Sequence, residues 1–469
     1  MPGAHTFNDG STILTPVANA LGVTVDKINL VSCLFVAVPL AIAYNNKLAK
    51  SGAAIRQAYP LSIGLAFCWF CFGGAIKHLL ANIFICYGLM HAVPAAHVHK
   101  AVFVFAMAYL TWIHYYRVMY LDSYTIDVTG AFMVVVQKVT TLAFSLHDGK
   151  GRKESDLSDL QKREAVKSVP ALLPYLSYLL HFQSVLTGPA CFYADWVHLT
   201  EGTHVPVDKD GKTPSAWTEA VWKFGASIFF LLGIALVEHH FPVTALTRTD
   251  QNIFVWLFLF WFTFVLQRFT YYFAWYFADA INNFSGFGFS GFDEKGEATW
   301  TLTTNVYAWD VEKAQSFKET LDAWNISTMG WLRRVAFDRA PKQYRTITTY
   351  MLSALWHGLF VGYYITFLTS ALITLGGKGF RRSLRWRFLG SPTSKFVYDV
   401  ITFLGTKFCL VYIAYPFVTL HAGPGLVMYK RLWFIGQIGS IFCAAVLPIL
   451  LPAPREKREA RKEEVKKVE

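Results

Sequence analysis

The sequence predicts an all-α integral membrane protein, a multi-helix transmembrane bundle with about eleven spans. Three observations support this fold class. Of the 469 residues, 54% are hydrophobic and only 16% are charged, whereas globular chains average about 25% charged residues. The mean hydropathy is positive, at +0.34. Long apolar runs recur from Ile28 to Pro452, without the ~10-residue alternation that is typical of membrane β-barrels.

Each spanning helix is expected where about 20 apolar residues follow one another, the length that crosses the hydrocarbon core. This rule gives helices over residues 28–45, 57–76, 78–96, 101–121, 130–147, 170–190, 221–247, 253–280, 346–376, 396–421 and 431–452. No internal repeat is visible. We therefore expect one polytopic domain over residues 1–454 and a basic cytosolic tail over 455–469.

The charged residues predict the orientation, because lysine and arginine collect in cytosolic loops. The tail is rich in both, which places the C-terminus in the cytosol. Leu121–Asp127 carries acids without a base and is expected in the lumen. The segment 148–167 carries both signs and is expected to be a solvated cytosolic loop with a short helix. The net charge of +12 favours anionic lipid or phosphate-bearing ligands over nucleic acid.

One predicted span has an unusual length. Residues 346–376 form a run of 31 residues between two basic segments, Arg333–Arg345 and Lys378–Arg387. As one helix this run would be ~46 Å long, against a core of ~30 Å. A broken or re-entrant helix with its break at Gly358 and Gly362 resolves the mismatch. Irregular backbone at that depth survives only inside protein or along a polar cavity, so a site is expected there.

His357 lies in this break. A histidine inside a membrane run is costly and often functional, although a packing histidine bonded to a backbone carbonyl is an equally ordinary interpretation. Burial favours the neutral imidazole that a general base requires. Asn325 comes 32 residues earlier, in an amphipathic stretch that would otherwise be read as an interfacial helix. An amide beside a neutral histidine could orient a substrate hydroxyl or stabilise an oxyanion.

The two segments around these residues resemble the membrane-bound O-acyltransferase family. They read Trp324-Asn-Ile-Ser-Thr-Met-Gly-Trp331 and Trp356-His-Gly-Leu-Phe-Val-Gly-Tyr363, and the family carries its asparagine and histidine in such contexts. The resemblance extends over nearly the whole chain and is greatest to the lysophospholipid acyltransferase 1 and 2 branch. Many relatives have Trp-Asp where this chain has Trp300-Thr301, so no role of that acid carries over.

The resemblance implies broken helices around a central reaction chamber in the endoplasmic reticulum membrane. It implies transfer of an acyl group from acyl-CoA to the free hydroxyl of a lysophospholipid, with lysophosphatidylethanolamine and lysophosphatidylserine favoured. His357 would act as general base and Asn325 would assist. Since no serine or cysteine lies beside a base in a recognisable nucleophile elbow, direct transfer is favoured over an acyl-enzyme. The candidates for the chamber wall are Trp324, Trp356, Tyr363 and Tyr175.

The expected partners are acyl-CoA as co-substrate, a lysophospholipid and membrane lipids, with no metal, no further cofactor and no nucleic acid. The basic segments Arg333–Arg345 and Lys378–Arg387 are candidates for attracting the CoA phosphates. Two alternatives stay open. One is a lysophosphatidylcholine- or lysophosphatidylinositol-directed acyltransferase of the same family. The other is a lipid or small-molecule transporter, since broken helices also form transporter sites. The sequence makes no prediction of oligomeric state.

Overall fold

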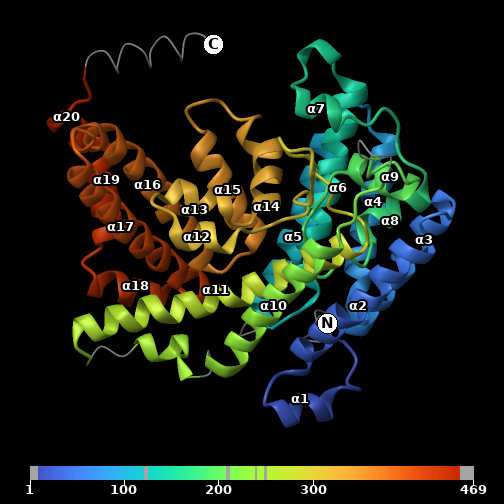
Figure 1. Cartoon of the computed structure of the whole chain (residues 1–469), viewed down its shortest axis with the longest axis horizontal. Helices are drawn as coiled ribbons and strands as arrows, with labels where there is room; N and C mark the ends of the chain where they lie inside the picture. The colour runs from blue at the N-terminus through green and yellow to red at the C-terminus, as the bar shows by residue number, and fades with distance from the viewer. Residues whose placement is uncertain (1–8, 121–124, 208–211, 238–239, 248–250, 455–469) are drawn as a thin grey trace.

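The computed structural model describes residues 9–120, 125–207, 212–237, 240–247 and 251–454. Helices make up most of these residues, which confirms the all-α prediction (Figure 1). The two strands described, β1 (Gly291–Phe292) and β2 (Ala298–Thr299), form one short antiparallel hairpin in which Gly291 lies opposite Thr299. The predicted basic tail lies outside the described residues.

The N-terminal helices form one group, on the right in Figure 1. They are α1 (Thr15–Leu21), α2 (Val25–Lys47), α3 (Ala53–Phe72), α4 (Ile76–Ala92), α5 (Val98–Tyr120), α6 (Val128–Gly151), α7 (Asp159–Arg163), α8 (Leu172–Leu180) and α9 (Tyr193–Glu201). Helix α6 is buried around most of its circumference, since the consecutive residues Val135 to Lys138, which point in different directions around the helix, are each at most 2% exposed. Helix α6 is therefore the central helix of this group, in contact with α4, α5 and α8.

Two long helices link this group to the rest of the chain. Helix α10 (Trp217–Val237) is followed by the short η5 (Val243–Thr247) and by α11 (Ile253–Phe284). Helix α11 has 32 residues and is therefore ~48 Å long. It packs against α10 along its length, against α2 in the N-terminal group and against α17 in the C-terminal group. It therefore runs across the molecule, as Figure 1 shows.

The remaining helices form a central set and a C-terminal group (Figure 1). The central set is α12 (Ala308–Lys313), α13 (Phe317–Ala323), α14 (Ile326–Leu332), the π-helical η6 (Arg333–Phe337) and α15 (Arg345–His357). The C-terminal group is α16 (Val361–Leu384), η7 (Arg385–Phe388), α17 (Pro392–Thr419), α18 (Ala422–Arg431), α19 (Ile435–Ile441), η8 (Phe442–Val446) and α20 (Leu447–Leu450). The central set lies between the two outer groups and carries the first sequence motif and the start of the second, which continues into α16.

The predicted break between 346 and 376 is confirmed. Helix α15 ends at His357 and α16 begins at Val361. Gly358 has φ +133°, a conformation that residues with a side chain rarely adopt. Gly362 lies inside α16 instead, where a Cβ would stand 2.1 Å from the carbonyl oxygen of Pro416. The first glycine therefore permits the break, and the second permits close packing of α16 on α17.

The prediction of about eleven spans is not matched by helices of sufficient length and apolarity. Within the described residues, six helices qualify, or seven if the bent pair of α18 with α19–α20 counts as one span. The predicted spans 57–76 and 78–96 join through a short 3₁₀ turn into one apolar stretch, Ala53–Ala92.

The predicted span over 170–190 is wrong. Its helix, α8, has nine residues and ends at Leu180. Beyond that point His181 and Ser184 both bind the ammonium group of Lys138, at 2.8 and 2.6 Å. Because these polar side chains turn inward to a buried lysine, the chain leaves the helix instead of crossing the membrane.

Candidate active site

The ring of His357 is enclosed by aromatic rings from α15, α16 and α17. The centroid distances are 4.7 Å to Trp356, 5.6 Å to Tyr363, 5.2 Å to Phe367 and 5.0 Å to Phe417. Trp356 and Tyr363 are buried, whereas His357 keeps a partly exposed surface. The imidazole is therefore held in an apolar surrounding without being sealed off. Two of the predicted wall residues, Trp356 and Tyr363, directly contact it.

A second histidine, which the sequence did not reveal, lies against the same break. His114 on α5 is 1% exposed, and its Nε2 lies 3.1 Å from the carbonyl oxygen of Trp356. That carbonyl belongs to the last turn of α15, where helix carbonyls lack intrahelical partners. A Cβ on Gly358 would stand 3.2 Å from Nδ1 of His114. His114 is thus a buried histidine bonded to a backbone carbonyl, the packing role that the sequence alone left open for His357.

One turn further along α5, Arg117 forms a buried ion pair with Asp127 at 2.8 Å. Asp127 also accepts a hydrogen bond from the backbone N–H of Thr129, at 2.8 Å, and so caps α6. The sequence had assigned this acid to a lumenal loop over Leu121–Asp127. In the described part of that loop the carboxylate is instead 3% exposed, because it ties the end of α5 to the start of α6.

Asn325 occupies the turn before α14, with φ +52° and ψ +51°. This left-handed conformation is uncommon for residues other than glycine, although asparagine tolerates it better than most. Its side chain accepts a hydrogen bond from Nδ2 of Asn305 at 3.2 Å, and the residue is partly exposed. The predicted amphipathic stretch is thus two short helices, α13 and α14, with Asn325 at their junction.

Helix α6 supports both motifs. The indole N–H of Trp331, in α14, donates to the hydroxyl of Thr140 at 2.9 Å. The indole N–H of Trp356, in α15, donates to the carbonyl of Met133 at 3.2 Å. The two indole rings also contact each other, with centroids 5.7 Å apart. Two segments that are distant in sequence are therefore fixed against one rigid helix, as a preorganised site requires.

The other two predicted wall residues have different surroundings. Trp324 packs against Tyr271, Tyr272 and Trp275 of α11, with centroids 5.0 to 5.8 Å apart. Tyr175 is fully buried and donates to the carbonyl of Ile83 in α4 at 2.8 Å. Among the described ring contacts, neither residue is a neighbour of His357. Their main role in this structure is packing.

The basic segment Arg333–Arg345 is partly neutralised by one buried acid. Asp148, 0% exposed, pairs with Arg334 at 3.2 Å, Arg339 at 3.0 Å and Arg152 at 3.1 Å. The prediction of a loop from residue 148 onward is therefore wrong over residues 148–151, because α6 continues to Gly151. The short helix predicted in this segment is present as α7. Three guanidinium groups around one carboxylate leave this edge of the protein positive.

Glu164, which follows α7, gives this region a pH dependence. Its side chain is 1% exposed, and burial together with the nearby Asp195 raises the pKa of its carboxyl from 4.5 to about 7. The folded protein then holds the proton more tightly than the unfolded chain, so stability is lost as pH rises from 4.5 to about 7. We expect the melting temperature of detergent-purified Glu164→Gln to change less between pH 5 and 8 than that of the unaltered protein. A variant whose melting temperature falls as steeply as that of the unaltered protein would contradict this.

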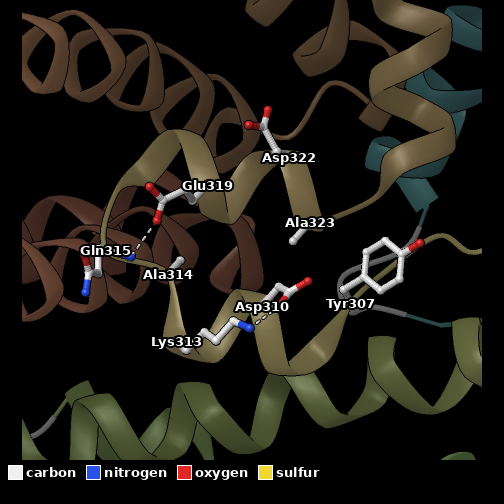
Figure 2. Close-up of a pocket in the computed structure, with 8 residues that line it drawn as sticks. All are labelled: Tyr307, Asp310, Lys313, Ala314, Gln315, Glu319, Asp322 and Ala323. Carbon is white, nitrogen blue, oxygen red and sulfur yellow. Dashed lines mark hydrogen bonds and ion pairs between the residues drawn. The ribbon is translucent and has the colours of Figure 1, made fainter. Parts of the chain in front are cut away.

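A separate pocket of about 590 Å³ opens beside α12 and α13 (Figure 2). Asp310 pairs there with Lys313 at 2.8 Å, and Glu319 accepts the backbone N–H of Gln315 at 2.9 Å. The lining residues are Tyr307, Asp310, Lys313, Ala314, Gln315, Glu319, Asp322 and Ala323. Carboxylates outnumber cations in it, so it is unsuited to CoA phosphates, and it includes neither His357 nor Asn325.

Comparison with known proteins gives a consistent result. A model of the membrane-bound O-acyltransferase family matches residues 113–415. The chain is 38% identical over 461 residues to membrane-bound glycerophospholipid O-acyltransferase 1 of Mus musculus, covering 94% of this chain and 93% of the relative. It is 37% identical over 464 residues to membrane-bound glycerophospholipid O-acyltransferase 2 of Gallus gallus, covering 95% and 89%. It is 28% identical over 473 residues to the lysophospholipid acyltransferase of Saccharomyces cerevisiae, covering 92% and 75%.

Proposed function

The chain belongs to the membrane-bound O-acyltransferase family, and on that premise we propose that it transfers a fatty acyl group from acyl-CoA to the free hydroxyl of a lysophospholipid. The relatives' names, glycerophospholipid O-acyltransferase and lysophospholipid acyltransferase, support the acceptor class. Lysophosphatidylethanolamine and lysophosphatidylserine are the favoured acceptors, because the chain resembles most the branch that acts on them. We place the reaction in the endoplasmic reticulum membrane, with a cytosolic C-terminus.

The observation that carries this proposal is the aromatic enclosure of His357 at a helix break. A neutral imidazole there accepts the proton of the lipid hydroxyl while the hydroxyl oxygen attacks the thioester carbonyl. A carbon–oxygen bond forms, the carbon–sulfur bond breaks, and CoA leaves as a thiol after receiving the proton from His357. General-base catalysis of this kind contributes about 10²–10⁴-fold. Asn325 assists by a hydrogen bond to a reacting group.

The positive edge around Asp148 supports acyl-CoA as the donor. Arg339 keeps 25% of its side chain exposed while it pairs with Asp148, and the side chain of Arg333 is 74% exposed. Guanidinium groups bind phosphate by paired hydrogen bonds, so partly exposed arginines suit the phosphates of CoA better than the acidic pocket of Figure 2 does. The proposal needs no metal or further cofactor.

The test is turnover by purified protein in detergent, given labelled acyl-CoA and a panel of lysophospholipids that differ only in head group. We expect labelled diacyl product, with more from lysophosphatidylethanolamine and lysophosphatidylserine than from lysophosphatidylcholine or lysophosphatidylinositol. A chelator added to a parallel sample is expected to leave the rate unchanged. The reverse order of head groups would overturn the acceptor preference. Lipid flux in reconstituted vesicles without any acylated product would favour a transporter.

A further inference from the structure

The residue beside Asn325 is itself held in one orientation. Asn305 is 3% exposed. Its side-chain oxygen accepts two hydrogen bonds from Ser327, one from the backbone N–H at 2.9 Å and one from the hydroxyl at 2.8 Å. Because a backbone N–H can only donate, the atom that faces it must be the amide oxygen of Asn305. The amide NH₂ group of Asn305 therefore faces the other way, toward Asn325.

The contact with Asn325 follows from this orientation. Nδ2 of Asn305 donates to Oδ1 of Asn325 at 3.2 Å, and the backbone carbonyl of Asn305 accepts the N–H of Ile326 at 2.9 Å. Asn305 thus contacts the two residues that follow the left-handed Asn325, Ile326 and Ser327, as well as the side chain of Asn325 itself. Since the oxygen of Asn325 is directed to Asn305, its own NH₂ group is directed elsewhere.

We infer that Asn305 is a positioning residue that makes Asn325 act on the substrate as a hydrogen-bond donor. This inference rests on the proposed function and deepens it. In acyl transfer, negative charge develops on the former thioester carbonyl oxygen, and a fixed donor stabilises it. His357 accepts the hydroxyl proton, so the two residues have complementary roles, one accepting and one donating.

The position of Asn305 is fixed by a buried ion pair between the two long helices. Lys223 of α10 lies 2.8 Å from the carboxylate of Asp279 in α11. That carboxylate also accepts the hydroxyls of Thr303 and Thr304, both at 2.7 Å. The two threonines immediately precede Asn305 in the chain. The rigid pair α10–α11 therefore determines where Asn305 stands, and through it how Asn325 is oriented.

The discriminating variant is Asn305→Asp, assayed at pH 8 with acyl-CoA and lysophosphatidylethanolamine. Its carboxylate still accepts both bonds from Ser327 but cannot donate to Asn325, and it attracts the NH₂ group of Asn325 instead. We expect kcat to fall at least ~10-fold, as for loss of an oxyanion donor, while both KM values stay within about twofold. Ser327→Ala is the matched control: it removes one bond to the same oxygen and is expected to keep kcat within about twofold.

A double-variant cycle separates positioning from a general structural effect. In an Asn325→Ala background, Asn305→Asp is expected to lower kcat by less than about twofold, because the residue it orients is already gone. If gel filtration shows that the Asn305→Asp protein aggregates, Asn305→Ala takes its place. It is likewise expected to lower kcat in the unaltered background and to have little effect in the Asn325→Ala background. Retention of wild-type kcat, a loss that appears in KM, or losses that multiply in the double variant would each overturn the inference and leave the proposed function intact. Absence of turnover by the unaltered protein would overturn both.

Discussion

Replacing His357 with alanine is expected to lower turnover by about 10²–10⁴-fold, the contribution of a general base. The ring lies among aromatic side chains from three helices, and none of these neighbours can accept a proton from the lipid hydroxyl in its place. The measurement is kcat of the purified variant at saturating acyl-CoA and lysophospholipid, together with its melting temperature. The account requires a large loss of kcat from a protein that still elutes as a folded species.

His78→Ala is the matched control for this variant. His78 is another histidine in an apolar helix, and its Nδ1 lies 3.1 Å from the hydroxyl of Tyr109. Its ring contacts are with Tyr109 and Trp112, not with the rings around His357. We expect it to retain turnover within a few-fold of the unaltered protein. Turnover of His357→Ala at the level of this control would remove His357 from the mechanism.

Replacing Asp279 with alanine is expected to destabilise the protein by up to about 3–5 kcal/mol, because buried Lys223 loses its nearest counter-charge and keeps only the 40% exposed Glu219, at 3.6 Å. Both partners are nearly buried, with side chains 5% and 4% exposed, and Thr303 and Thr304 lose their acceptor at the same time. We expect a lower melting temperature and lower turnover, since the segment that carries Asn305 loses its anchor. The measurements are thermal melting and turnover in the same detergent.

The exposed pair of Asp310 with Lys313 provides the comparison. Its N–O distance is 2.8 Å, like that of the buried pair, but its side chains are 58% and 48% exposed. Surface ion pairs contribute about 0–1 kcal/mol, so Asp310→Ala is expected to melt close to the unaltered protein. The double variant Lys223→Met/Asp279→Leu is expected to regain part of the stability lost in Asp279→Ala, because no buried charge remains. Equal melting temperatures for Asp279→Ala and Asp310→Ala would contradict this account of the anchor.

The fold class and the break at Gly358 were predictable because both follow from local properties. Apolar composition indicates a membrane protein, and a run too long for one span and too short for two must bend. The prediction over 170–190 failed for the opposite reason. Apolar residues and length suited a span there, but His181 and Ser184 bind Lys138 on another helix, a contact that no local pattern reveals.

The site residues divide in the same way, into those with a local sequence signal and those that only tertiary contacts bring to the site. His357 and Asn325 stood out because of their sequence contexts, and Trp356 and Tyr363 because they belong to the same short motif as the histidine. His114 and Asn305 were missed, since they reach the site only through tertiary contacts, across 242 and 20 residues respectively. The only local signal for His114 was a polar residue three positions before Arg117 within an apolar run. Tyr175 was named for its aromatic ring, a property it shares with many packing residues.

Direct transfer at His357 is tested most simply by following CoA thiol release and labelled product together. Enzyme is mixed with labelled acyl-CoA, with and without lysophosphatidylethanolamine, and both products are quantified over the first turnovers. We predict equal amounts of thiol and diacyl phospholipid when the acceptor is present, and neither when it is omitted. A burst of thiol equal to the enzyme concentration without acceptor would indicate an acyl-enzyme, and would contradict direct attack by the lipid hydroxyl.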